Sequence, residues 1–235
     1  MHIEKYNRNA VGHIFNHMIN SEARAKRKNV DNSKEYLNYN ILNTDKKPKE
    51  LLNELMNRDD IYCSRRKDIV VATSICITAP ENLPESRYDE FFYNAAMFFN
   101  NRYNTKDKYC PCLGAFVHKN EMSKNQNGNN KPHMHYLMSN LIFDHKKERY
   151  KFCCKEIITR KDLSTLHQDF KEYIDKAMNL DLEIINGATA NGNKTILELK
   201  NQELEKKVAH QQEEIEKLKQ LKNKLQNQIE YELAR

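Results

Sequence analysis

The segment that most constrains this chain is residues 132–138, which read PHMHYLM. Successive side chains of a β-strand point to opposite faces, so His133 and His135 share one face while Met134 and Tyr136 share the other. A single histidine is more often a structural residue than a ligand. Two imidazoles on one face, backed by bulky apolar residues, predict a sheet strand that carries half of a metal site.

A third candidate ligand lies upstream, in residues 114–121 (GAFVHKNE). The apolar part of this segment predicts a strand that ends at His118, and Glu121 follows one turn later. Residues 122–131 are polar, rich in Asn and contain Gly128, a composition typical of the loop between two hairpin strands. Closing this hairpin would set His118 beside His133 and His135. The alternative is three unrelated histidines in a chain that has nine.

The remaining pattern predicts an α+β domain built around an antiparallel sheet, with helices packed on the sheet. The links between elements are mostly hairpin-like. In the predicted helix over 10–20, His13 and His17 are four residues apart and should share a face. The predicted helices are residues 10–20, 48–58, 85–103 and 159–178, and the predicted strands are residues 36–41, 69–78, 114–118, 133–138, 141–143 and 150–154.

The net charge of +6 is unevenly distributed. Residues 195–235 contain eight basic and eight acidic side chains, so the whole excess lies in residues 1–194. Basic runs occur at 24–28, 65–67 and 146–151. Lys and Arg neutralise phosphates, so the excess favours nucleic-acid binding, although a solvated surface would also explain it.

The cysteines and the apolar segments indicate a cytoplasmic protein. Cys153 and Cys154 are adjacent, and Cys110 and Cys112 flank a proline, which is not typical of a secreted disulfide framework. These pairs would form a structural zinc site only if their strands abut. No apolar run is long enough to span a membrane, and residues 1–5 lack the apolar region of a signal peptide.

The C-terminal residues show a heptad repeat. Residues 186–194 are small and polar and predict a linker between a domain over 1–185 and a coiled coil over 195–235. Leucine dominates one seam and β-branched residues the other, which favours a parallel homodimer over a single solvated helix. The seams are Leu197, Leu204, Gln211, Leu218, Leu225 and Glu232, and Asn201, Val208, Ile215, Lys222 and Ile229.

Several of these segments resemble one family. His118-x-Asn120-Glu121, followed by residues 132–135 (PHMH), is similar to the His-x-Asp-Glu … Pro-His-Met-His motif of the Pre/Mob plasmid mobilisation and recombination proteins. These are the MobV relaxases, members of the HUH endonuclease superfamily. Residues 37–39 (LNY) look like the family's Leu-Asn-Tyr motif, and residues 66–68 (RKD) look like its Arg-Lys-Asp-Ala-Val segment. His17 stands 21 residues before Asn38, as the family's N-terminal histidine does.

The chain also departs from the family pattern. Asn120 replaces the Asp of the motif, the loop before Pro132 is longer, and Asn20 stands where the N-terminal motif has Arg. Either Arg24 or Arg27 could substitute for that missing side chain. The resemblance spans residues 10–185, and since family members often run longer, the chain could be a truncated or minimal member.

The resemblance implies an HUH-type relaxase domain that nicks one DNA strand at the transfer origin of a plasmid or mobile element. The enzyme would stay joined to the 5′ phosphate during conjugative mobilisation. It implies His17 as nucleophile, with His13 as the fallback, and Glu121 as the carboxylate that holds the nucleophile or joins the metal. His118, His133 and His135 would bind a divalent ion, Mn²⁺ or Mg²⁺. Contacts to single-stranded origin DNA are expected from Asn38, Tyr39, Arg24, Arg27, Arg66 and Lys67.

Two other functions fit the same residues. A replication initiator or transposase of the HUH class would use a tyrosine nucleophile, for which Tyr36, Tyr39 and Tyr173 are the candidates. A non-catalytic coiled-coil DNA-binding protein would hold the metal only as a structural ion.

Overall fold

The computed structural model describes residues 1–19, 26, 30–121, 132–185 and 196–233. Arg24, Arg27, the predicted hairpin loop over 122–131 and the predicted linker over 186–194 lie outside these residues. The chain divides into two compact units, Met1–Ile185 and Asn186–Arg235. No helix among the described residues is long and apolar enough to cross a membrane.

The first unit is built on a five-stranded antiparallel sheet with the strand order β1-β4-β7-β6-β2. The strands are β1 (His2–Asn7), β2 (Tyr39–Asn40), β4 (Val70–Thr78), β6 (Cys112–His118) and β7 (His133–Ser139). The prediction of an α+β fold around an antiparallel sheet is confirmed. Strand β1 was not predicted, because at the edge of the sheet it needs few apolar residues and has only Ile3 and Tyr6.

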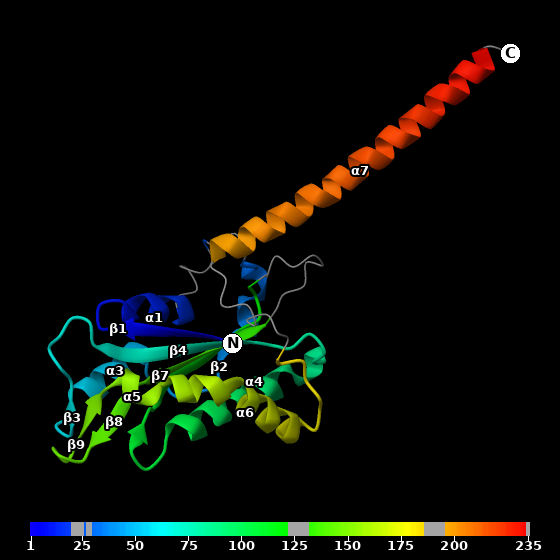
Figure 1. Ribbon diagram of the computed structural model, residues 1–235. Helices are drawn as coiled ribbons and strands as arrows, with labels where there is room; N and C mark the ends of the chain where they lie inside the picture. The colour runs from blue at the N-terminus through cyan, green and yellow to red at the C-terminus, as the bar shows by residue number, and fades with distance from the viewer. Residues whose placement is uncertain (20–25, 27–29, 122–131, 186–195, 234–235) are drawn as a thin grey trace. The chain divides into compact units, whose positions relative to one another are not determined.

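Helices cover both faces of this sheet (Figure 1). Helices α4 (Tyr88–Tyr103) and α6 (Arg160–Met178) pack on one face, where an apolar core includes Phe99, Tyr136 and Phe170. The rings of Phe99 and Phe170 stack with centroids 5.6 Å apart. Helices α1 (Val11–Ile19) and α3 (Pro48–Met56) pack on the other face against a second core. The histidine-bearing strands therefore lie between two apolar layers.

A smaller sheet with the strand order β3-β9-β8-β5 adjoins the second core. Its strands are β3 (Ile61–Tyr62), β5 (Lys108–Tyr109), β8 (Leu141–Asp144) and β9 (Arg149–Phe152), and only β3 and β9 are parallel. Short helices complete the unit: η1 (Asn32–Leu37), η2 (Glu85–Arg87) and α5 (Cys154–Ile157).

The predicted strand over 36–41 is mostly wrong. Residues up to Leu37 belong to the 3₁₀ helix η1, because the Asp31 side chain caps it by accepting hydrogen bonds from the Ser33 backbone N–H and hydroxyl. Only Tyr39 and Asn40 pair in β2. The predicted strand over 150–154 is likewise shorter, ending at Phe152 before α5 begins.

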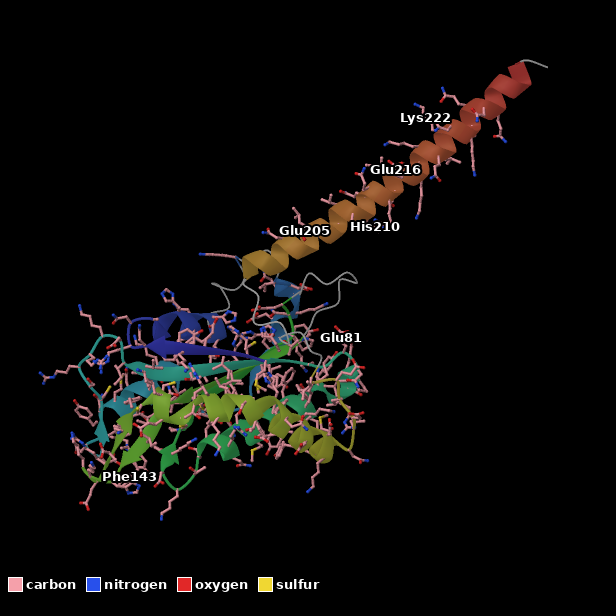
Figure 2. The ribbon with its side chains drawn as sticks, in the orientation of Figure 1. Glu81, Phe143, Glu205, His210, Glu216 and Lys222 are labelled. Carbon is pink, nitrogen blue, oxygen red and sulfur yellow. The ribbon has the colours of Figure 1, made fainter. Side chains whose placement is uncertain are left out.

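The second unit contains the helix α7 (Ile196–Leu233), which confirms the predicted helix but not its pairing. Polar and charged side chains project along it, among them Glu205, His210, Glu216 and Lys222 (Figure 2). The large apolar side chains described on α7 are exposed as well: Leu204, Val208, Ile215, Leu218, Leu221 and Leu225.

Candidate metal and nucleophile site

The register of β6 and β7 brings the hairpin histidines together. His118 lies directly opposite His133, and Phe116 lies opposite His135. Residues opposite one another in an antiparallel pair share a face, so all three histidines lie on the face that α1 and α3 cover. The predicted placement of His118 beside His133 and His135 is confirmed.

A fourth imidazole reaches this cluster from α1. The buried side of α1 packs its apolar residues onto the sheet, and this contact turns His17 towards the strands. The Nε2 atoms of His17 and His135 are 3.0 Å apart, and the His17 ring centroid is 5.2 Å from that of His118. Each of the four histidines offers a ligand atom, and these atoms all lie within 4.8 Å of one another.

His13 does not join the cluster, although it precedes His17 by four residues. Its side chain is exposed, whereas that of His17 is half-buried. Four residues of an α-helix turn through about 400°, so the two rings point about 40° apart, and only His17 turns inward. The two histidines therefore lie on adjoining parts of one helix face, and only His17 is close to the strand histidines.

Glu121 lies beside the ligand candidates and is only 9% exposed. Its carboxylate oxygens are 3.5 Å from His118 Nδ1 and 3.9 Å from His133 Nε2. Oε1 accepts no hydrogen bond from the residues that the structure describes. Several imidazole nitrogens beside one buried carboxylate form a donor set that suits a divalent first-row transition metal, so these residues fit such an ion.

The cysteines form no second centre of this kind. Within the described part of the chain, the four histidines are the one group of three or more His, Cys, Asp or Glu side chains close enough to hold an ion. Cys76 lies opposite His135 in the sheet, and burial raises the pKa of its thiol to about 11. The Cys76 thiol is not one of the grouped ligand atoms.

Two residues expected to contact DNA occupy different positions around β6. Asn38 caps η1, donates from Nδ2 to Asn120 Oδ1 at 2.8 Å and accepts at Oδ1 from the Lys119 backbone N–H. Tyr39 lies opposite Val117, hence on the face away from the histidines, and its hydroxyl donates to Asp89 at 2.5 Å. Burial and Asp89 raise the pKa of Tyr39 above its ordinary value, which disfavours it as a nucleophile.

Arg66 and Lys67 lie far from the cluster. Both are exposed and precede Val70, whereas the histidines adjoin Cys76 and Thr78 at the other end of β4. Eight residues of strand span about 26 Å, so these side chains do not reach the histidines. Arg66 instead pairs with Asp68.

The other tyrosine candidates are also displaced from the histidines. Tyr173 packs against Phe98 in the helical layer on the opposite face, and Tyr36 is 80% exposed. The tyrosine that does share the histidine face is Tyr6 of β1, which sequence reasoning missed. Its hydroxyl donates to Glu4, and this hydrogen bond lowers the pKa of the Glu4 carboxyl. The alternation of His2, Glu4 and Tyr6 was the signal that could have found it.

A family model and several solved structures are similar to this chain, and both comparisons indicate the same group of proteins. The family model Mob_Pre, described as plasmid recombination enzyme, matches residues 1–184. Three solved structures of the MobM relaxase domain, bound to plasmid pMV158 oriT DNA and Mn, are similar to this chain at 23–24% identity and TM-scores of 0.60–0.61. The similarity covers 85% of this chain and 96–97% of each of those chains, and at this identity it establishes the fold. No curated protein sequence is similar enough to count as a match.

Proposed function

Because this chain belongs to the Mob_Pre family of plasmid recombination enzymes, we propose that it is a relaxase. It nicks one strand of DNA at a transfer origin and becomes joined to the 5′ phosphate through His17. The observation that carries this proposal is the cluster of four histidines, three from the paired strands β6 and β7 and one from helix α1.

The two groups of histidines have different tasks. His118, His133 and His135 stand on hydrogen-bonded strands whose register fixes their spacing, so they are the metal ligands. Three protein ligands leave coordination positions open for phosphate oxygens. When bound by these three histidines, a divalent ion would neutralise charge that develops on the scissile phosphate. The MobM structures contain Mn, and imidazole ligands are compatible with that choice, so we assign Mn²⁺ as the ion, with Mg²⁺ as the alternative.

His17 is the nucleophile, because it comes from a separate helix and presents its ring to the same cluster. The unprotonated nitrogen of the neutral His17 imidazole attacks phosphorus, and the bond from phosphorus to the 3′ oxygen breaks. The imidazolium formed releases its N–H proton to solvent, and the leaving 3′ oxygen takes up a proton from solvent to become the 3′ hydroxyl. The product is a phosphoramidate between His17 and the 5′ phosphate. The Glu121 carboxylate lies 3.5 Å from His118 Nδ1 and 3.9 Å from His133 Nε2, so we assign it to orienting the ligand rings.

Single-stranded DNA is the proposed partner of the first unit. Apart from Lys194, the basic excess lies in that part of the chain. Because Arg66 and Lys67 are at the far end of β4, they would contact a segment of DNA away from the scissile phosphate. Asn38 serves the proposed site by holding the end of β6, whereas Tyr39 would contact DNA only on the opposite face. Arg24 and Arg27 remain candidates for the missing motif arginine.

A nicking assay tests the nucleophile. Supercoiled plasmid carrying the protein's own origin is incubated with Mn²⁺ and the His17→Ala, His13→Ala, Tyr6→Phe and Tyr173→Phe variants. Only His17→Ala is expected to lose the covalent adduct while it still binds origin DNA. The wild-type adduct should be acid-labile and alkali-stable, as a phosphoramidate is. An adduct that persists in His17→Ala and disappears in Tyr6→Phe would contradict the proposal.

A further inference from the structure

The end of β6 is held by a segment far away in the sequence. The Asp31 backbone N–H donates to the Asn120 carbonyl at 2.8 Å, and Val30 forms a β-bridge with Glu121. The Lys119 backbone N–H donates to Asn38 Oδ1 at 2.8 Å. The three residues that follow His118 are thus each tied to the segment around η1.

These contacts fix the orientation of two side-chain amides. Since Asn38 Oδ1 accepts from a backbone N–H, its Nδ2 must be the group that donates to Asn120 Oδ1, at 2.8 Å. Asn120 must then direct its own Nδ2 the other way. That Nδ2 donates to Glu35 Oε2 at 2.7 Å, and Asn38 Nδ2 also lies 3.0 Å from the same oxygen.

Asn120 is completely buried, so its amide depends on these partners. The Glu35 carboxylate accepts from both amides. A carboxylate at position 120 could still accept a hydrogen bond from Asn38 Nδ2. Its second oxygen would then lie next to Glu35 Oε2, and neither oxygen would carry a proton to donate. Position 120 therefore needs a donor because Glu35 is present.

We propose that Glu35 is a positioning residue for the metal site and that Asn120 is matched to it. Glu35 holds the Asn120 amide, and this amide fixes the backbone between His118 and Glu121. The inference rests on the proposed metal site. It also accounts for the amide of Asn120 at a position where the similar family motif has an acidic residue. In this chain Glu35 supplies the acidic group, and it is hydrogen-bonded to Asn120.

The test measures Mn²⁺ affinity of the full chain by calorimetry and thermal unfolding of the metal-free protein. The variants are Asn120→Asp, Glu35→Gln and the double variant, with Asn53→Asp and Glu54→Gln as exposed controls on α3. Asn120→Asp should weaken Mn²⁺ binding about 10–100-fold, the usual effect of removing an outer support of a metal ligand. In the double variant, the amide introduced at position 35 can donate to the new carboxylate, and affinity should return to within about threefold of wild type. Glu35→Gln alone should change the Mn²⁺ affinity less than about threefold. The amide introduced at position 35 retains an oxygen that can accept the hydrogen bond from Asn120 Nδ2.

The outcomes separate this inference from the proposed function. If the wild-type chain binds no Mn²⁺, the metal site itself is wrong and the inference fails with it. If wild type binds Mn²⁺ but the double variant is as weak as Asn120→Asp, or Asn120→Asp binds normally, only the inference fails. A purely structural network would lower the unfolding temperature and leave the Mn²⁺ affinity of the folded protein unchanged. If Asn120→Asp does not fold, the double variant still tests the inference, because the inference requires that this variant folds and binds Mn²⁺.

Discussion

At the scale of single residues, the site depends on the burial of the histidine side chains. His118 is 1% exposed, so its ring is enclosed by neighbouring side chains, and it lies opposite the partly buried His133. Gly114 shows how close the packing is: a Cβ there would lie 2.3 Å from the ring of Phe116, the residue opposite His135.

Removing one hairpin imidazole should abolish the metal site. His118→Ala, His133→Ala and His135→Ala should each weaken Mn²⁺ binding more than about 100-fold, because losing an outer support alone costs about 10–100-fold. Calorimetry of the full chain measures this effect. His145→Ala is the matched control, since His145 is exposed and pairs with Asp107. Unchanged Mn²⁺ affinity in two of the three hairpin variants would rule the site out.

At the scale of elements, α4 and α6 support the sheet from behind the histidines. Arg102 of α4 is 17% exposed and joins α4 to α6 by pairing with Asp162 at 2.8 Å and Asp169 at 2.7 Å. The Tyr103 hydroxyl donates to the same Asp162. This network ties two helices whose aromatic residues form the core under β7.

Arg102→Met should lower the free energy of unfolding by about 3 kcal/mol at pH 7, since it leaves a mostly buried carboxylate without its cation. Arg102 also lowers the pKa of Asp169, the more exposed of its two carboxylate partners. The smaller, solvent-screened contribution of that pair is present above the unfolded carboxyl pKa of about 3.9 and is lost as pH falls through the folded value. Urea unfolding of wild type and variant at pH 7 and pH 3 measures the effect. The difference between them should shrink at pH 3, and a constant difference would show that the charge pair contributes little.

At the scale of the whole molecule, charge and apolar surface are divided between the two units. The basic excess lies in residues 1–194, and the 195–235 segment is neutral overall. On α7, however, apolar side chains such as Val208, Ile215 and Leu218 are exposed at heptad spacing.

The charge distribution predicts a salt-dependent affinity for single-stranded DNA. With about four phosphate contacts, a rise in salt from about 50 to 200 mM should weaken binding about 50-fold, because bound counterions are released. Fluorescence anisotropy of the full chain with a labelled oligonucleotide at several salt concentrations measures the slope. An affinity that is independent of salt would show that the basic excess is only a solvated surface.

The apolar seam of α7 predicts a parallel homodimer. Burying the seam of one helix against another removes Val208, Ile215, Leu218 and Leu225 from water. The full chain should sediment as a dimer at micromolar concentration, and Ile215→Glu combined with Leu218→Glu should convert it to a monomer. Gln220→Glu is the control, since it lies outside the seam. A monomeric wild-type chain would contradict the prediction.

Local periodicity was enough to predict the histidine hairpin, the central strands and most of the helices. The alternation of His133 and His135 and the turn composition before them depend only on neighbouring residues, so sequence alone placed His118 beside them. The long helix of the C-terminal unit was predicted for the same reason. The resemblance added His17, which no local pattern could have linked to residues more than a hundred positions away.

Only the tertiary structure decided which side chains share the site. It turned His17 inward and left His13 exposed, because the packing of α1 on the sheet sets the direction of each ring. It placed Tyr39 on the opposite face and Arg66 at the far end of β4, since strand register and sheet order depend on contacts distant in the sequence. It also joined Glu35 to Asn120, a pairing that arises only when η1 packs against the end of β6.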